Sequence, residues 1–161
     1  VTGLSHLEGE EVVGWADGAS AADQSSMLTV SGGEITLPAP ATDITVGLPY
    51  TARWRSTKLA YGAARGTALS QYKRPNHLGL YFVDTALAGV RIGRDFDNLT
   101  GVATNDRGQP IDFNSVLETH DVDLQQINGD WDVDSRVCIE MRAPYPVSPA
   151  ALVIAMKTND R

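Results

Sequence analysis

The sequence has little that would build a disulfide framework or cross a membrane. Its single cysteine, Cys138, cannot form an internal disulfide, which is compatible with a reducing compartment. No apolar run approaches the roughly 20 residues that span a bilayer, and no basic segment followed by an apolar one marks a signal peptide. We therefore expect no membrane anchor. Because the chain begins with Val1 rather than Met, we expect a fragment of a longer protein or a processed form.

Basic residues are also scarce. The 161 residues include 20 acidic and 13 basic side chains, for a formal net charge of −7. Basic side chains cluster in sequence only at Arg53, Arg55 and Lys58 and at Lys73-Arg74. Proteins that grip nucleic acid through phosphates usually show a basic patch, so this composition disfavours tight nucleic-acid binding. It is compatible with a surface that lets DNA pass without binding it, because like charges repel.

The catalytic and cofactor motifs that spacing can identify are missing. There is no Gly-x-Ser-x-Gly nucleophile turn, no His-Glu-x-x-His zinc pair, and no Lys-Ser/Thr after Gly66 to complete a phosphate loop. His77, His120 and Cys138 stand alone in the sequence, and a structural zinc site needs more ligands than these spacings offer. We therefore expect no catalytic residue and no cofactor.

What the chain does contain is a series of short alternating segments separated by turn residues. Hydrophobic residues make up 42% and charged residues 20% of the chain, a globular composition that suits one domain or two small ones. Alternation with turn signals every ten residues or so is typical of all-β proteins. The sequence predicts a mainly β fold, built of small antiparallel sandwich or barrel modules with at most one short helix.

Residues 1–55 predict a first small β-hairpin or barrel module. A strand over 12–15 ends at the turn Asp17-Gly18, and a further strand covers 44–48. Between them, segments 28–30 and 35–37 flank Gly32-Gly33, where two glycines can supply the positive φ of a tight hairpin turn. The hairpin is the strongest local signal in the chain.

Residues 56–75 predict a crossover loop. Alanine is frequent there and β-branched residues are few, so a short helical turn within 67–73 is compatible with the composition. Gly62 and Gly66 limit its length, and Pro75 limits any continuous strand after it.

Residues 76–161 predict a second β module. Strands are expected over 78–83, 90–92, 116–124, 137–141 and 152–156, with 93–115 mostly loop. The last of these segments is a continuous apolar run, which suits a strand buried on both faces. Modules as small as these two can share one core.

Three groups of polar residues are candidate sites. His6 and Glu8 point the same way in an extended segment and could form a dyad. No serine or cysteine nucleophile with a recognisable context accompanies them. We interpret them as surface residues of a turn that Leu4 and Leu7 anchor.

The second group is Asp130, Asp132 and Asp134, whose alternating carboxylates are similar to those of a calcium loop. Ser135 replaces the glycine expected at the sixth position, and Met141 replaces the bidentate glutamate expected at the twelfth. A turn leading into the strand over 137–141, with Arg136 neutralising the acids, is the better interpretation. A weak cation site at the three aspartates is the alternative.

The third group is the carboxylate pair Asp95 and Asp97, which could do acid–base work in a glycosidase. Nothing in the sequence places a partner opposite the pair, so we interpret it as a solvated loop with Phe96 inserted into the core. Aromatic residues, namely Trp54, Trp131 and Tyr61, could stack on sugar rings, although tryptophans more often anchor cores and interfaces.

Several stretches together resemble the C-terminal β-region of tail tube and nozzle proteins of short-tailed bacteriophages and related prophages. They are VTGLSHLEGEEVVGWADG (1–18), VSGGEITLPAPATDITVGLPYTARWRS (30–56), KRPNHLGLYFVDT (73–85) and GDWDVDSRVCIEMRAPYPVSPAALVIAMKTN (129–159). The resemblance lies in a pattern of turns and strands, not in a catalytic signature, and it is weak over 86–127. Pro75 after Lys73-Arg74 departs from the pattern.

The resemblance implies a structural, non-enzymatic virion component made in the bacterial cytoplasm. Identical subunits, six in number, would form a ring in a DNA exit conduit, next to portal and adaptor proteins, and DNA would pass without being bound tightly. The alternative function is a carbohydrate-binding or glycan-cleaving β-module of a phage tail, with Trp131, Trp54 and Tyr61 as the glycan contacts.

Overall fold

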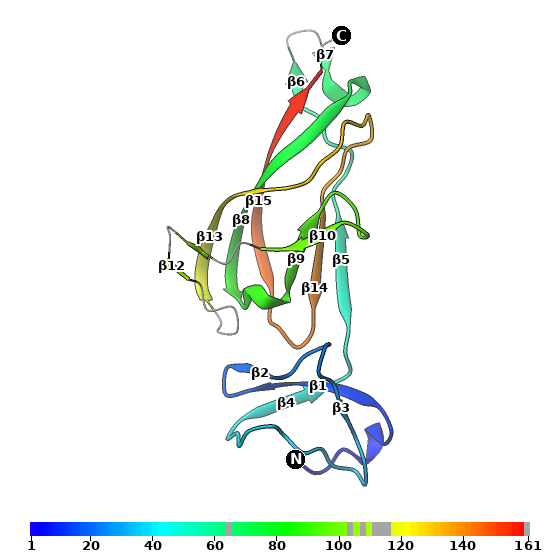
Figure 1. Cartoon of the computed structure of the whole chain (residues 1–161), viewed down its shortest axis with the longest axis vertical. Helices are drawn as coiled ribbons and strands as arrows, with labels where there is room; N and C mark the ends of the chain where they lie inside the picture. Colours follow the sequence, from blue (N-terminus) through cyan, green and yellow to red (C-terminus); the bar gives the residue numbers. More distant parts are fainter. Residues whose placement is uncertain (64–65, 103–104, 107–108, 111–116, 160–161) are drawn as a thin grey trace.

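The computed structural model describes residues 1–63, 66–102, 105–106, 109–110 and 117–159 (Figure 1). The fold is mainly β, as the alternating pattern predicts, with three larger antiparallel sheets and short 3-10 turns. Within the described ranges no helix reaches seven residues, and none is long and apolar enough to cross a membrane.

The N-terminal module is a four-stranded sheet centred on β1 (Glu11–Ala16). Strand β1 follows a 3-10 turn, η1 (Ser5–Leu7). It pairs with β2 (Ala19–Ala22), β3 (Leu28–Thr29) and β4 (Ile44–Gly47). Three buried residues make its core, and apolar side chains of the flanking turns pack against them: Val12, Val30 and Ile35, with Leu4, Leu7, Leu28, Leu37 and Val46. The core of this module is small, and carboxylate hydrogen bonds brace its turns as well.

The predicted hairpin is only partly correct. Gly32 and Gly33 do adopt positive φ, and Ser31 and Glu34 exchange backbone hydrogen bonds across them. The expected strand over 35–37 is wrong, because Ile35 instead exchanges hydrogen bonds with the backbone of Val1. Val1, 34 positions away, takes these backbone groups of Ile35, which a local pattern does not reveal.

Two sheets face each other in the larger body of the molecule. One has the order β10-β9-β14-β5, formed by β5 (Thr51–Arg55), β9 (Val90–Gly93), β10 (Leu99–Gly101) and β14 (Cys138–Arg142). The other has the order β13-β8-β15, formed by β8 (Lys73–Thr85), β13 (Leu117–Gln126) and β15 (Ser148–Thr158). A 3-10 turn, η3 (Leu87–Gly89), leads from β8 into β9.

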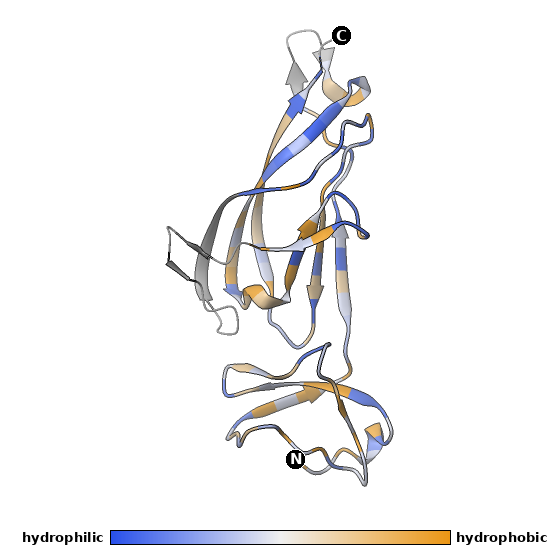
Figure 2. Ribbon diagram, viewed as in Figure 1, coloured by the Kyte–Doolittle hydropathy of each residue, from blue (hydrophilic) through white to orange (hydrophobic). Residues whose placement is uncertain are grey.

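The core of the body lies between these sheets. It consists of Leu78, Leu80, Phe82, Leu87, Val90, Ile92, Val102, Ile127, Val137 and Ile139. The strands that supply most of these residues contain orange, hydrophobic segments in Figure 2. The buried residues of the N-terminal module form a separate cluster.

β5 belongs to the body and not to the first module that the sequence analysis outlines. It pairs along its whole length with β14, from Thr51–Arg142 to Arg55–Cys138. The chain therefore crosses from one sheet to the other within the few residues between Gly47 and Thr51.

The crossover segment holds short elements. β6 (Gly62–Ala63) pairs with β7 (Gly66–Thr67), and a 3-10 turn, η2 (Ala68–Ser70), forms where a helical turn is compatible with the sequence. Two further short strands, β11 (Asn105–Asp106) and β12 (Gln109–Pro110), pair within the expected loop region 93–115.

The expected limit at Pro75 is wrong, because β8 runs straight through it. Pro75 lies opposite Met156, next to a register shift in β15, and beyond the last β13–β8 pair, Gln126–His77. Irregular and terminal stretches of a ladder tolerate a residue that cannot donate.

The expectation that 152–156 is buried on both faces is also wrong. Among the residues that the structure describes, β15 is an edge strand that pairs only with β8, so Leu152 and Ile154 pack against the core while Val153 is 52% exposed. A continuous apolar run is therefore compatible with an edge strand as well as with a central strand.

Candidate functional site

Six arginines surround one face of the β10-β9-β14-β5 sheet. Ile139 and Met141 of β14, like Val137 just before the strand, point into the core, so the alternate residues of this strand and of its neighbours point outward. The outward positions and the adjoining loops supply Arg53, Arg55, Arg91, Arg94, Arg136 and Arg142, which we call the arginine face. The sequence shows only two of these residues as neighbours in a basic cluster; strand register brings the others to them.

Glu140 is buried at the centre of the arginine face. Its side chain is 1% exposed, and its carboxylate accepts hydrogen bonds from Arg53 Nε at 3.0 Å and Arg142 Nε at 2.8 Å. Burial by itself would raise the pKa of Glu140, but the two guanidinium groups outweigh it, so the pKa lies below its ordinary value. Glu140 thus holds β5 against β14 as an ionised group.

We expect Glu140→Gln to lower the free energy of unfolding by about 1–2 kcal/mol at neutral pH, because it removes charge-assisted hydrogen bonds to half-exposed partners. A depressed folded-state pKa contributes stability above the unfolded pKa, and this is lost as pH falls through the folded pKa. Urea titrations between neutral pH and pH about 3 should therefore show the two proteins converging in acid. Parallel pH profiles would contradict this role, and Asp43→Asn, at an exposed position, is the control.

The loop Arg94–Asn98 lies against the arginine face. Its Phe96 ring lies 5.1 Å from the Arg53 guanidinium and is half-buried there, so the expectation that Phe96 enters the core is wrong. Cys138 lies beneath the loop, with its Sγ 3.7 Å from the Arg94 carbonyl oxygen, and burial raises the pKa of its thiol.

The acid pair Asp95 and Asp97 is not a facing pair of catalytic carboxylates. Asp95 Oδ1 accepts hydrogen bonds from the backbone N–H groups of Asp97 and Asn98 and from the Asn98 side chain. The Asn98 side chain is the main cause that lowers the pKa of Asp95. Asp95 therefore closes its own loop.

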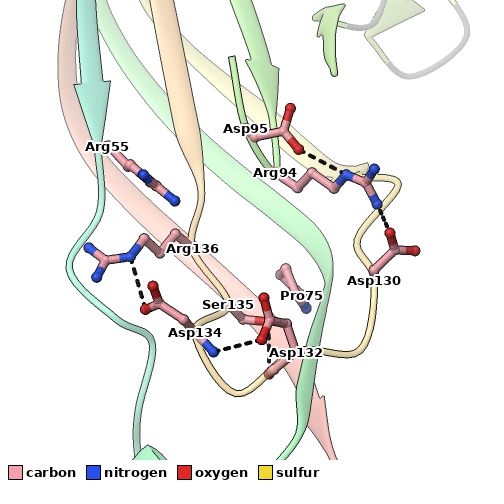
Figure 3. A pocket seen from close by; sticks show the side chains of 9 residues that line it. All are labelled: Arg55, Pro75, Arg94, Asp95, Asp130, Asp132, Asp134, Ser135 and Arg136. Carbon is pink, nitrogen blue, oxygen red and sulfur yellow. Dashed lines mark hydrogen bonds and ion pairs between the residues drawn. The ribbon is translucent and has the colours of Figure 1, made fainter. Parts of the chain in front are cut away.

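The three aspartates proposed as a weak cation site border a shallow cavity of about 190 Å³, but they point to different partners (Figure 3). Asp130 pairs with Arg94, and Asp134 pairs with Arg136 Nε at 3.0 Å. Asp132 Oδ1 accepts the Asp134 backbone N–H at 3.0 Å. In the part of the chain that the structure describes, no three His, Cys, Asp or Glu side chains are placed to hold a metal ion.

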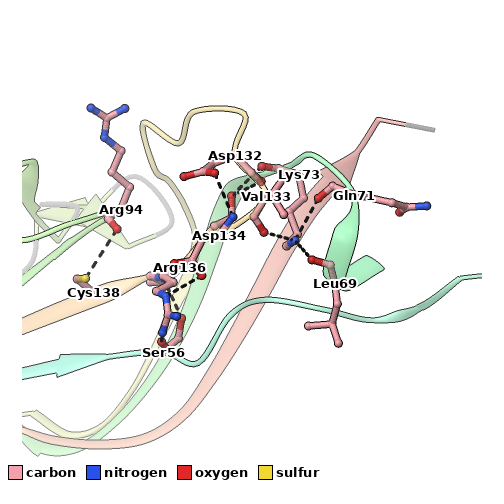
Figure 4. Close-up of polar contacts among 12 residues, drawn as sticks. Ser56, Leu69, Gln71, Lys73, Arg94, Asp132, Val133, Asp134, Arg136 and Cys138 are labelled. Carbon is pink, nitrogen blue, oxygen red and sulfur yellow. Dashed lines mark hydrogen bonds and ion pairs between the residues drawn. The ribbon is translucent and has the colours of Figure 1, made fainter. Parts of the chain in front are cut away.

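Lys73 is fully buried next to this cavity, a feature that sequence reasoning missed. Its ammonium donates to the carbonyl oxygens of Ala68, Leu69, Gln71 and Val133, at 3.0, 3.4, 3.2 and 2.6 Å (Figure 4). Burial, assisted by the nearby Lys58, lowers its pKa, and Asp132 and Asp134 oppose this only in part. The lysine ties the crossover turn to the loop before β14.

Carboxylates of the N-terminal module also bind backbone. Glu8 accepts the N–H groups of Gly32 and Gly33 at 2.9 and 2.7 Å, so it braces the hairpin turn rather than pairing with His6. Asp17 accepts those of Thr42 and Asp43, and these two bonds lower its pKa.

Asp23 and Tyr145 join the module to the body. The Asp23 carboxylate accepts hydrogen bonds from Ser25 and Ser26 and from the Tyr145 hydroxyl, the last at 3.2 Å. The Tyr145 ring contacts the Trp15 ring edge-on, with 5.9 Å between the ring centroids. The Ser25 hydroxyl is the main cause that lowers the pKa of Asp23.

The aromatic residues proposed as glycan contacts do not gather in one site. Trp54 borders an apolar cavity of about 260 Å³ between β5 and β15. Tyr61 borders a neighbouring cavity, which also contains Leu152, and its hydroxyl lies 2.7 Å from that of Thr158. Trp131 is 45% exposed and lines neither cavity.

Comparison with known proteins does not assign a family. A scan of the sequence against protein-family models gives no match, and a search of curated proteins gives none either.

Proposed function

We propose that this chain is a structural, non-enzymatic component of a phage tail tube or nozzle. In this proposal, identical subunits form a ring that contributes to the wall of a DNA exit conduit, next to portal and adaptor proteins. The sequence resemblance supports the family, and the arrangement of the polar side chains supports the structural role.

The observation that carries the structural role is the use of the carboxylates. Glu8, Asp17, Asp95 and Asp132 each accept backbone N–H groups of neighbouring turns. Catalytic carboxylates instead need to converge on a substrate with their lone pairs free. Here the same groups stiffen loops, which is what a rigid wall requires.

A second function is favoured by one observation only. Trp54 is 43% exposed beside an apolar cavity, as in a surface that stacks on sugar rings. A carbohydrate-binding or glycan-cleaving tail module therefore stays the alternative.

Electron microscopy of the full-length protein tests the proposal. We expect hollow rings, because a head-to-tail contact that closes by rotation produces a ring, and six subunits in each, as the resemblance implies. A monomer that binds a bacterial surface glycan on an array, with the signal lost in Trp54→Ala, would contradict the structural proposal and favour the alternative.

A further inference from the structure

The net charge of the chain is confined to one end of it. Residues 1–52 contain seven acidic residues and no lysine or arginine, whereas residues 53–161 contain 13 of each sign. The N-terminal module therefore carries the whole net charge of −7. In Figure 1 it lies at one end of the long axis, and the sheet with the arginine face lies beyond it.

Three glutamates of this module have no partner within the described residues. Glu10, Glu11 and Glu34 are exposed, and no hydrogen bond or ion pair holds their carboxylates. Backbone pairing brings them to one end of the module. The Val30 N–H donates to the backbone carbonyl oxygen of Glu10, and the next residue, Ser31, pairs through its backbone with Glu34. We call this group the glutamate end.

Two of the six guanidinium groups on the arginine face form no ion pair among the described residues. Arg53 and Arg142 share Glu140, while Arg94 and Arg136 pair with aspartates. Arg55 and Arg91 form no ion pair among the described residues, although Arg55 is exposed and Arg91 half-buried. A planar guanidinium suits a carboxylate geometrically, because it can donate two parallel hydrogen bonds.

We infer that the glutamate end of one copy docks on the arginine face of a second copy. The inference rests on the proposed ring and names the contact that builds it. Because the two surfaces are different parts of the chain, the contact is heterologous and leaves one free surface of each kind until the ring closes.

A nucleic acid is the less suitable occupant of the arginine face. Four of the six arginines are already shared with carboxylates, so few charges are left for phosphates. The acidic module of the same chain would also repel a polyanion. A second copy offers carboxylates and is attracted by both uncompensated arginines.

Charge exchange tests the contact. One variant of the full chain carries Arg55→Glu and Arg91→Glu, and the other carries Glu10→Arg and Glu11→Arg. Sedimentation velocity at about 20 mM salt, where charges are weakly screened, should show wild-type association that weakens at about 500 mM. Each variant alone should associate at least tenfold more weakly. An equimolar mixture should recover association, because each mismatched surface then meets a complementary one.

The control variant Lys58→Glu/Lys157→Glu changes the net charge as much as the first variant but leaves the arginine face intact. It should associate like the wild type, and circular dichroism should show that all variants fold. Variants that associate like the wild type, a mixture without recovery, or a wild type that stays monomeric at low salt would overturn the contact.

Two further outcomes separate this inference from the proposed function. Rings seen by microscopy with no effect of the exchanges would keep the proposed function and overturn the contact. Recovery in the mixture without any ring would support the contact and contradict the ring. Duplex DNA added at low salt should not bind; tight binding that the Arg55→Glu/Arg91→Glu variant loses, with association unchanged, would assign the face to nucleic acid instead.

Discussion

Replacing Lys73 with methionine is expected to lower the free energy of unfolding by about 2–4 kcal/mol. Methionine fills a similar volume but cannot donate, so four backbone carbonyl oxygens lose their shared donor. Two of them, those of Ala68 and Leu69, belong to the turn η2, and that of Val133 belongs to the loop before β14. Both segments should loosen together.

The loss stays below the sum of the missing hydrogen bonds for a physical reason. Burial lowers the pKa of Lys73, which means that the fold holds the ammonium at a cost. Methionine removes that cost together with the bonds. The relief from this desolvation cost therefore offsets part of the stability lost with the hydrogen bonds.

Urea unfolding of Lys73→Met against the wild type measures the effect, and a decrease of roughly 4–16 °C in melting temperature should accompany it. Lys157→Met is the matched control, since Lys157 is exposed on β15, and its effect should stay within about 0.5 kcal/mol. Equal stability of the two variants would show that the carbonyl contacts contribute little.

Gly129→Ala is expected to destabilise the body by about 2–3 kcal/mol. A Cβ at this position would overlap the Pro75 carbonyl oxygen and lie 3.0 Å from the Pro75 ring atoms Cγ and Cδ. Pro75 cannot yield easily, because it pairs with Met156 of β15, and backbone hydrogen bonds hold the residues on both sides of it, Asn76 to Ile127 and Lys73 to Asp132. The strand and the loop would have to separate, and the Ile127 N–H bond to the Asn76 carbonyl would be strained.

Gly101→Ala provides the comparison for this substitution. Gly101 is exposed in β10, and no atom of the described residues lies within 4 Å of a Cβ built there. Its replacement should leave stability unchanged or raise it by up to about 1 kcal/mol, since alanine restricts the unfolded chain. Thermal melts of both variants decide the matter: similar melting temperatures would mean that the Pro75 contact relaxes without cost.

The sequence predicts where the strands and turns of this fold lie better than it predicts which strands pair with each other. Alternation at 137–141 and the glycines at 32 and 33 identify a strand and a turn, because both signals are local. Pairing is not local. The positions of β5 in the body, of Pro75 inside β8 and of β15 at an edge depend on residues far along the chain.

The same distinction applies to the candidate site. The pairing of Asp134 with Arg136 follows from their spacing, and the structure contains it. The group of Arg53, Glu140 and Arg142 is spread over 90 positions and meets only through the β5–β14 register. A glutamate alternating with apolar residues and followed by Arg142 is the one signal that could have pointed to a buried ion pair.

The bond between Glu8 and the Gly32-Gly33 turn has a consequence for any polyanion that slides past the module. Successive backbone N–H groups in a turn of positive φ make a concave socket of the kind that captures phosphate. Here the molecule fills the socket with its own side chain. In the proposed conduit, a phosphodiester that passes this turn would meet an occupied socket, so the turn would not capture it.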